Sequence, residues 1–82
     1  GIVLFSNWTY ESGNNIIIDH KNGYLSFYKH NKRNLARERQ VVHRGDPIAF
    51  LGNSGLSSGP HLHFEVWNDG KPMDPKSLIL NI

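Results

Sequence analysis

Two histidines and a glutamate follow one another at intervals of two residues in the stretch SSGPHLHFEVW (57–67). Side chains along a β-strand point alternately to opposite faces, so His61, His63 and Glu65 would project from one face and apolar side chains from the other. Imidazole and carboxylate groups are zinc ligands, and a catalytic zinc ion takes three protein ligands and activates a water molecule. The alternative is a solvent-facing polar face, which is the commoner meaning of His-x-His taken alone.

Strands are the elements that must position these residues. Apolar or alternating runs predict strands over 2–6, 14–20, 23–30, 47–52 and 61–67. Asn22-Gly23 is a strong hairpin signal, and NDGK (68–71) predicts a tight turn. Residues 31–39 predict a loop with one turn of helix, and Asp74 before a proline predicts the cap of a short C-terminal helix. The chain therefore predicts an all-β fold of antiparallel sheets.

Composition excludes several classes of protein. Nine Lys and Arg against seven Asp and Glu give a formal net charge of +2, too slight to indicate nucleic-acid binding. The chain has no cysteine, so a metal would need His, Asp or Glu ligands. No apolar run approaches the roughly 20 residues that span a bilayer. With 82 residues, the chain can build one compact core.

Several ordered blocks together resemble the lysostaphin/LytM-type zinc metallopeptidases, which cleave peptide cross-bridges and stems in bacterial peptidoglycan. These blocks are IIIDHKNGYLSFYKHN (16–31), VVHRGDPIAFLG (41–52), NSGLSSGPHLHFEVW (53–67) and DGKPMDP (69–75). The resemblance covers nearly the whole chain and implies that family's fold, a small barrel-sandwich hybrid. It also implies a zinc-dependent endopeptidase acting on peptidoglycan peptides at the bacterial cell envelope, in the periplasm or outside the cell.

The resemblance assigns roles to individual residues. It makes His63 a zinc ligand, His61 a catalytic histidine that does not bind the metal, and His30 the partner of His61 across the site. The implied mechanism is attack of zinc-bound water on a peptide carbonyl, with His30 and His61 orienting the water and stabilising the oxyanion. Glu65 either holds a zinc-binding histidine in place or is an ordinary surface residue. Tyr28 either lines the substrate cleft or packs across the strands.

One part of the family pattern is missing. The family's other two zinc ligands, a histidine and an aspartate four residues apart, precede the strand that GIVLFS (1–6) resembles, and no such pair occurs before Asn14. We therefore expect residues 1–82 to be the C-terminal part of an N-terminally truncated lysostaphin-type domain, with Zn²⁺ bound in the complete domain and little activity in these residues alone.

Two further explanations of the missing pair stay open. A neighbouring chain supplies the missing strands, or the domain is a non-catalytic relative that binds the cell wall or regulates a partner. Missing strands also leave exposed sheet edges, which predict strand exchange or oligomer formation.

Overall fold

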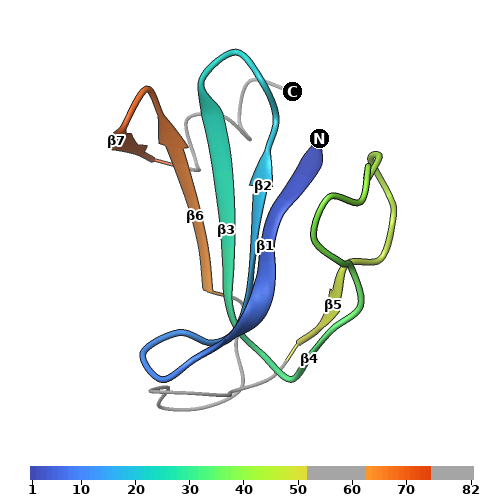
Figure 1. The fold of residues 1–82 in the computed structure, drawn as a ribbon. Coiled ribbons are helices and arrows are strands. Elements are labelled where there is room, and N and C mark those ends of the chain that lie inside the picture. The colour runs from blue at the N-terminus through green and yellow to red at the C-terminus, as the bar shows by residue number, and fades with distance from the viewer. Residues whose placement is uncertain (52–62, 75–82) are drawn as a thin grey trace.

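The computed structural model describes residues 1–51 and 63–74, and every regular element in these ranges is a β-strand. Five strands form an antiparallel sheet in the order β1-β2-β3-β6-β7, while β4 and β5 form a second, two-stranded sheet (Figure 1). The strands are β1 Ile2–Thr9, β2 Gly13–Asp19, β3 Tyr24–Asn31, β4 Arg33–Asn34, β5 Ala49–Phe50, β6 His63–Asn68 and β7 Lys71–Met73. The predicted all-β, antiparallel fold is confirmed.

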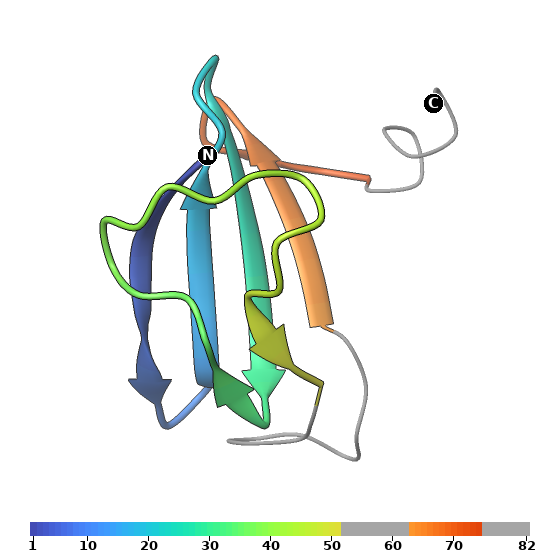
Figure 2. The ribbon, with the colours of Figure 1, turned by 90° about the vertical axis from the view of Figure 1, so that its right-hand side faces the viewer.

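The core lies between the large sheet and the segment that connects β4 to β5. Figure 2 shows this connection passing across one face of β1, β2 and β3. Alternate residues of the sheet, Val3, Ile16 and Ile18, meet Ala36 and Val42 of the connection, and all five are buried. Burial of these branched side chains on one face explains why the two-residue repeat of β1 and β2 is strong in the sequence.

The turn of helix predicted within residues 31–39 is wrong. A helix would need each backbone N–H to bond to the carbonyl four residues earlier. Instead, the N–H groups of Leu35 and Ala36 both donate to the carbonyl of Ile48, at 2.8 and 2.9 Å. Hydrogen bonds to a distant segment therefore override the helical composition of this stretch.

The strand predicted over 47–52 is shorter than expected and extends only over Ala49–Phe50. The expected helix after Asp74 falls on residues 75–82, which lie outside the described residues. No helix within residues 1–51 and 63–74 has the length and apolar composition that a membrane crossing requires.

Both edges of the large sheet carry features that oppose pairing with another strand. At the β1 edge, Val3 accepts a hydrogen bond from the amide of Arg39 and donates one to the carbonyl of Gln40, at 2.7 and 2.9 Å. At the other edge, β7 has three residues and contains Pro72, which has no N–H to donate. Strand exchange stays a prediction, but these edges offer less free backbone than the sequence indicates.

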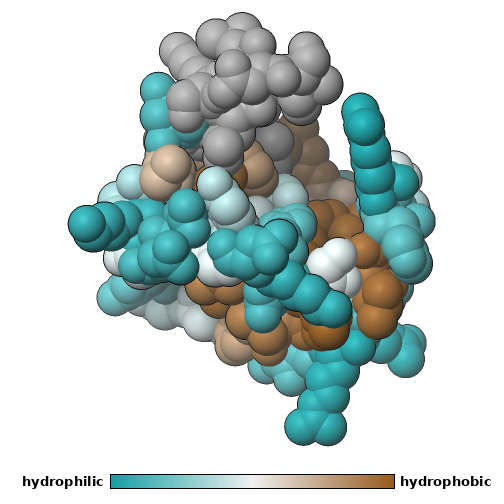
Figure 3. All heavy atoms as spheres, turned by 90° about the horizontal axis from the view of Figure 1, so that it is seen from above, coloured by the Kyte–Doolittle hydropathy of each residue, from teal (hydrophilic) through white to brown (hydrophobic). Residues whose placement is uncertain are grey.

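Apolar side chains nevertheless reach the surface at β1, at the segment bridged to it, and at the end of β5. Leu4 and Val41 are 52% and 56% exposed, and Phe50 and Leu51 are 52% and 61% exposed. Seen from above, hydrophobic residues are visible at the surface among hydrophilic ones (Figure 3). Contact with another chain or segment would bury this surface, so the prediction of oligomer formation rests on these side chains more than on the sheet edges.

The hairpin signal at Asn22-Gly23 is confirmed. Both residues have positive φ, 55° and 82°, as the central positions of a type I′ turn require, and the amide of Tyr24 donates to the carbonyl of Lys21 at 3.1 Å. Asp69 and Gly70 repeat this arrangement between β6 and β7, with φ of 50° and 79°.

Replacing Gly23 with alanine is expected to lower the free energy of unfolding by about 1–2 kcal/mol, because an added Cβ must adopt positive φ next to a neighbouring side chain. That Cβ would lie 2.1 Å from Oδ1 of Asp69. Gly45→Ala is the matched control, since Gly45 has a φ of +91° and nothing within 4 Å of an added Cβ. Urea unfolding of both variants separates the two effects: equal losses would show that the Asp69 contact contributes nothing.

Candidate functional site

Pairing of β3 with β6 brings two of the predicted histidines together. The ladder aligns Lys29 with His63, so His63 lies beside the end of β3, where His30 follows. The ring centroids of His30 and His63 are 5.6 Å apart, with an angle of 66° between the rings. His30 is 7% exposed, and its φ of 59° breaks the regular alternation of β3. The buried ring of His30, whose backbone has a left-handed conformation, thus lies against the half-buried ring of His63.

Glu65 is the centre of a polar cluster on the face of β6 that also carries His63. Its Oε2 lies 2.7 Å from Nε2 of His63 and 2.8 Å from Nζ of Lys29, and its Oε1 accepts a hydrogen bond from Nε1 of Trp67 at 3.1 Å. His63 and Glu65 therefore share one face, as the two-residue repeat predicts. A carboxylate only accepts, so Nε2 of His63 carries the proton, and the lone pair of the neutral ring is on Nδ1.

These contacts stabilise the charged form of Glu65. The hydrogen bond from Lys29, opposed by partial burial and assisted by His63 and Trp67, lowers the pKa of Glu65 from its ordinary value of 4.5 to about 2. The carboxylate therefore stabilises the folded protein above pH 4.5, and this contribution is lost as the pH falls from 4.5 towards 2.

Glu65→Gln is expected to cost about 1–2 kcal/mol of stability at neutral pH and much less near pH 3, a magnitude that allows for solvent screening of a partly exposed ion pair. The side chains of Lys29 and Glu65 are 27% and 30% exposed. Urea unfolding in the presence of a chelator measures the difference, with Glu11→Gln as a control at an exposed carboxylate. A loss that does not shrink between neutral pH and pH 3 would contradict the assignment.

Tyr28 lies on the opposite face from His63. It is paired with Phe64, at 5.2 Å between ring centroids, and packs against the core. This position fits the packing role. Tyr28 also lines an apolar hollow of about 360 Å³, next to Asn31 and β5, so the cleft-lining role remains a prediction. His61, the remaining predicted catalytic residue, lies outside the described residues.

Two members of the polar cluster, Lys29 and Trp67, were not predicted from the sequence. Trp67 follows His63 and Glu65 at the same spacing, so the two-residue repeat contained the signal. Lys29 gave no such signal, because its contact with Glu65 depends on the register between β3 and β6.

The sequence pattern of peptidase family M23 matches residues 1–75. The chain belongs to this family. Its five-stranded antiparallel sheet is the M23 fold, as solved structures with high similarity confirm.

This M23 chain is similar to three proteins of named function or known structure. The murein hydrolase activator NlpD of Escherichia coli is 49% identical over 63 residues, which are 77% of this chain and 16% of that protein. The peptidoglycan DD-endopeptidase ShyA of Vibrio cholerae is 38% identical over 73 residues, 89% of this chain and 17% of that protein. A zinc-containing peptidase from Vibrio cholerae has a TM-score of 0.86 and 38% identity over 90% of this chain and 23% of its own. The chain thus spans less than a quarter of each.

The zinc-containing relative raises the question of whether the described residues of this M23 chain fit a zinc ion. Within residues 1–51 and 63–74, no group of three or more His, Cys, Asp or Glu side chains is arranged to hold a metal. A catalytic zinc ion takes three protein ligands. Of the predicted zinc ligands, the described residues contain His63, whose Nε2 contacts Glu65, so they alone do not fit a complete catalytic zinc site.

Proposed function

We propose that this M23 chain is part of a zinc-dependent endopeptidase that hydrolyses peptide bonds in bacterial peptidoglycan. The observation that carries the proposal is the approach of the His30 and His63 rings to 5.6 Å from two different strands. Those are the residues to which the family resemblance assigns a catalytic role and a metal-binding role. The name of ShyA, a peptidoglycan DD-endopeptidase, supports the substrate class. From this substrate we infer that the protein works at the bacterial cell envelope, in the periplasm or outside the cell.

In this proposal each described residue has a defined task. Glu65 holds the His63 ring through Nε2 and fixes the tautomer in which Nδ1 can bind a metal. His30, held in one position by burial, donates a hydrogen bond to the carbonyl oxygen of the substrate as negative charge develops there. The family resemblance gives His61 the task of acting with His30 on the water and the oxyanion. The remaining metal ligands come from outside residues 1–51 and 63–74.

A second function is favoured by one specific finding. The relatives with 49% identity are named murein hydrolase activators, so a related chain of this family is associated with activation. Under this alternative the same scaffold binds the cell wall or a hydrolase and has no hydrolytic role of its own. His30 and His63 would then line a binding surface.

Digestion of purified peptidoglycan by the intact gene product separates the two functions. We expect peptide bonds to be cut, the products to be identified by mass spectrometry, and the activity to disappear with a chelator and return with added zinc. An activator would release no products by itself and would increase the rate of a separate peptidoglycan hydrolase, with or without chelator. Absence of both effects would reject both functions.

A further inference from the structure

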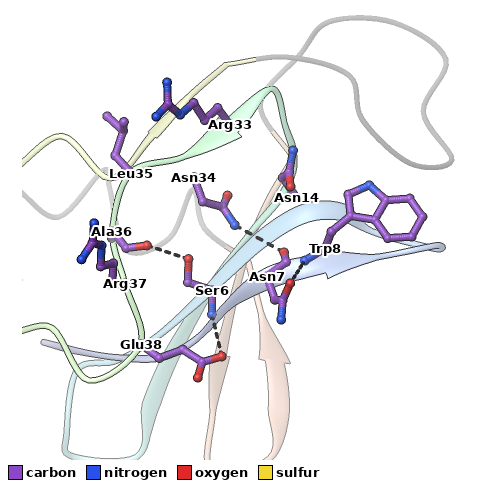
Figure 4. Close-up of a pocket in the computed structure, with 10 residues that line it drawn as sticks. All are labelled: Ser6, Asn7, Trp8, Asn14, Arg33, Asn34, Leu35, Ala36, Arg37 and Glu38. Atoms are coloured by element: carbon purple, nitrogen blue, oxygen red, sulfur yellow. Dashed lines mark hydrogen bonds between the residues drawn. The ribbon is translucent and has the colours of Figure 1, made fainter.

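A groove whose lining includes neither His30 nor His63 lies between β1 and the segment 33–38 (Figure 4). Its volume is about 690 Å³, within the range of small-molecule sites. Ser6, Asn7 and Trp8 of β1, Asn14 of β2 and residues 33–38 line it. The proposed hydrolysis assigns no task to these residues.

The floor of the groove is fixed by hydrogen bonds within the protein. Asn34 donates from Nδ2 to the carbonyls of Asn7 and Asn15, at 3.3 and 3.1 Å, and its Oδ1 accepts from Asn31 at 3.1 Å. The hydroxyl of Ser6 donates to a carbonyl of the facing segment at 2.6 Å. These groups are therefore occupied in holding the two walls together, and recognition falls to the side chains of the walls.

The walls present an aromatic ring and two positive charges. Trp8 is 52% exposed and extends from β1 at one end of the groove, while Arg33 and Arg37 are exposed on the facing segment (Figure 4). Neither arginine has a carboxylate partner in the part of the chain that the structure describes. Glu38, which accepts the amide hydrogen of Ser6 at 3.5 Å, is the carboxylate of this lining. Two guanidinium groups against one carboxylate leave the groove positive.

This combination matches a saccharide that carries carboxylates. An indole ring stacks on the apolar face of a sugar, and guanidinium groups bind carboxylates through paired hydrogen bonds. Oδ1 of Asn7 accepts the amide hydrogen of Trp8 at 2.8 Å, which leaves Nδ2 of Asn7 to donate to hydroxyl and acetamido oxygens. We propose that the groove binds an acidic, N-acetylated saccharide of the kind that forms the glycan strands of peptidoglycan. That the saccharide comes from peptidoglycan rests on the proposed function. That it is acidic and N-acetylated is inferred from the side chains of the groove.

The groove is connected to the histidine pair through buried amides. Asn31 directly follows His30 and is buried, with 3% of its surface exposed. Its Nδ2 donates a hydrogen bond to Oδ1 of Asn34 in the groove floor. β3 ends at Asn31, and β4, whose two residues line the groove, begins at Arg33 (Figure 1). A glycan held in the groove would therefore keep its attached peptides near His30 and His63.

Isothermal titration calorimetry on the intact protein with chelator tests the proposal without hydrolysis. The probes are glycan strands stripped of their peptides, which carry free lactyl carboxylates, a neutral N-acetylglucosamine oligomer, and a free stem peptide. Trp8→Ala is compared with Tyr10→Ala, an aromatic residue that is 69% exposed outside the groove. Arg33→Gln and Arg37→Gln are compared with Arg44→Gln, an exposed arginine outside the groove.

We expect the stripped glycan to bind most tightly, and Trp8→Ala to weaken its binding about tenfold, while Tyr10→Ala leaves it unchanged. The arginine substitutions should weaken binding of the acidic glycan by a similar factor but not that of the neutral oligomer. Wild-type affinity in the Trp8 and arginine variants would overturn the proposal, as would binding of the stem peptide in place of the glycan. Glycan binding by a protein that cuts no peptide bond would reject the peptidase function and leave this inference standing.

Discussion

Replacing His63 with alanine is expected to lower the rate of peptidoglycan-peptide hydrolysis by the intact protein at least about a hundredfold, because loss of a metal ligand costs no less than loss of a residue that orients one. The measurement is the release of cleaved peptides, together with the zinc content of the purified variant. His43→Ala is the matched control, since His43 is an exposed histidine whose ring lies 3.7 Å from Asp46 in a turn. A variant at His63 that keeps the wild-type rate and zinc content would show that this residue binds no catalytic metal.

His30→Ala tests the other half of the pair and has a different expected pattern. If His30 acts on the substrate and not on the metal, the variant should keep the zinc content of the wild type while its kcat falls. Loss of zinc in this variant would instead make His30 a ligand. The 5.6 Å separation of the two rings is compatible with a shared site, so metal content is the readout that separates the roles.

Ile16→Ala is expected to reduce the free energy of unfolding by about 3–4 kcal/mol, because it removes a large side chain from a closed core and leaves a cavity. Ile16 is 0% exposed and packs with Val3 and Ile18. A loss of this size is a large share of the about 5–15 kcal/mol that stabilises a typical domain. Urea unfolding followed by circular dichroism measures it.

Ile17→Ala provides the control for this substitution. The residue type is the same and the position is the next one in β2, but Ile17 points to the other face of the sheet and is only half-buried. We expect a loss of about 1 kcal/mol for this variant. Equal losses for the two variants would mean that the core does not lie on the side of the sheet assigned to it.

The features that sequence analysis predicted correctly are those determined by near neighbours. The β-branched run of β2 alternates buried and half-buried positions, so its strand and its buried face follow from the residue types. The turn at Asn22-Gly23 follows from two residues that tolerate positive φ. The shared face of His63 and Glu65 needs only the strand repeat.

The features that could not be predicted from the sequence depend on contacts between distant parts of the chain. Lys29 reaches Glu65 because β3 and β6 pair in one register, and a shift by one residue would point Lys29 away. The helical composition of residues 31–39 is overridden by the hydrogen bonds of this segment to Ile48. The groove beside Trp8 forms only when that segment folds against β1, so no local pattern in the sequence indicates it.

The pairing of β6 with β3 also has a consequence for the order of folding. β1, β2 and β3 are joined by short hairpins, whereas the partners Tyr24 and Asn68 are far apart in the chain, and closing such a long loop is slow. We expect the first three strands to form early and β6 to join them late, which pulse-labelled hydrogen exchange would reveal as earlier protection of amides in β2 than in β6. Simultaneous protection would contradict this order. The growing chain would then carry a folded meander before His63 is in place, so any chemistry of the histidine pair begins only after β6 has joined the sheet.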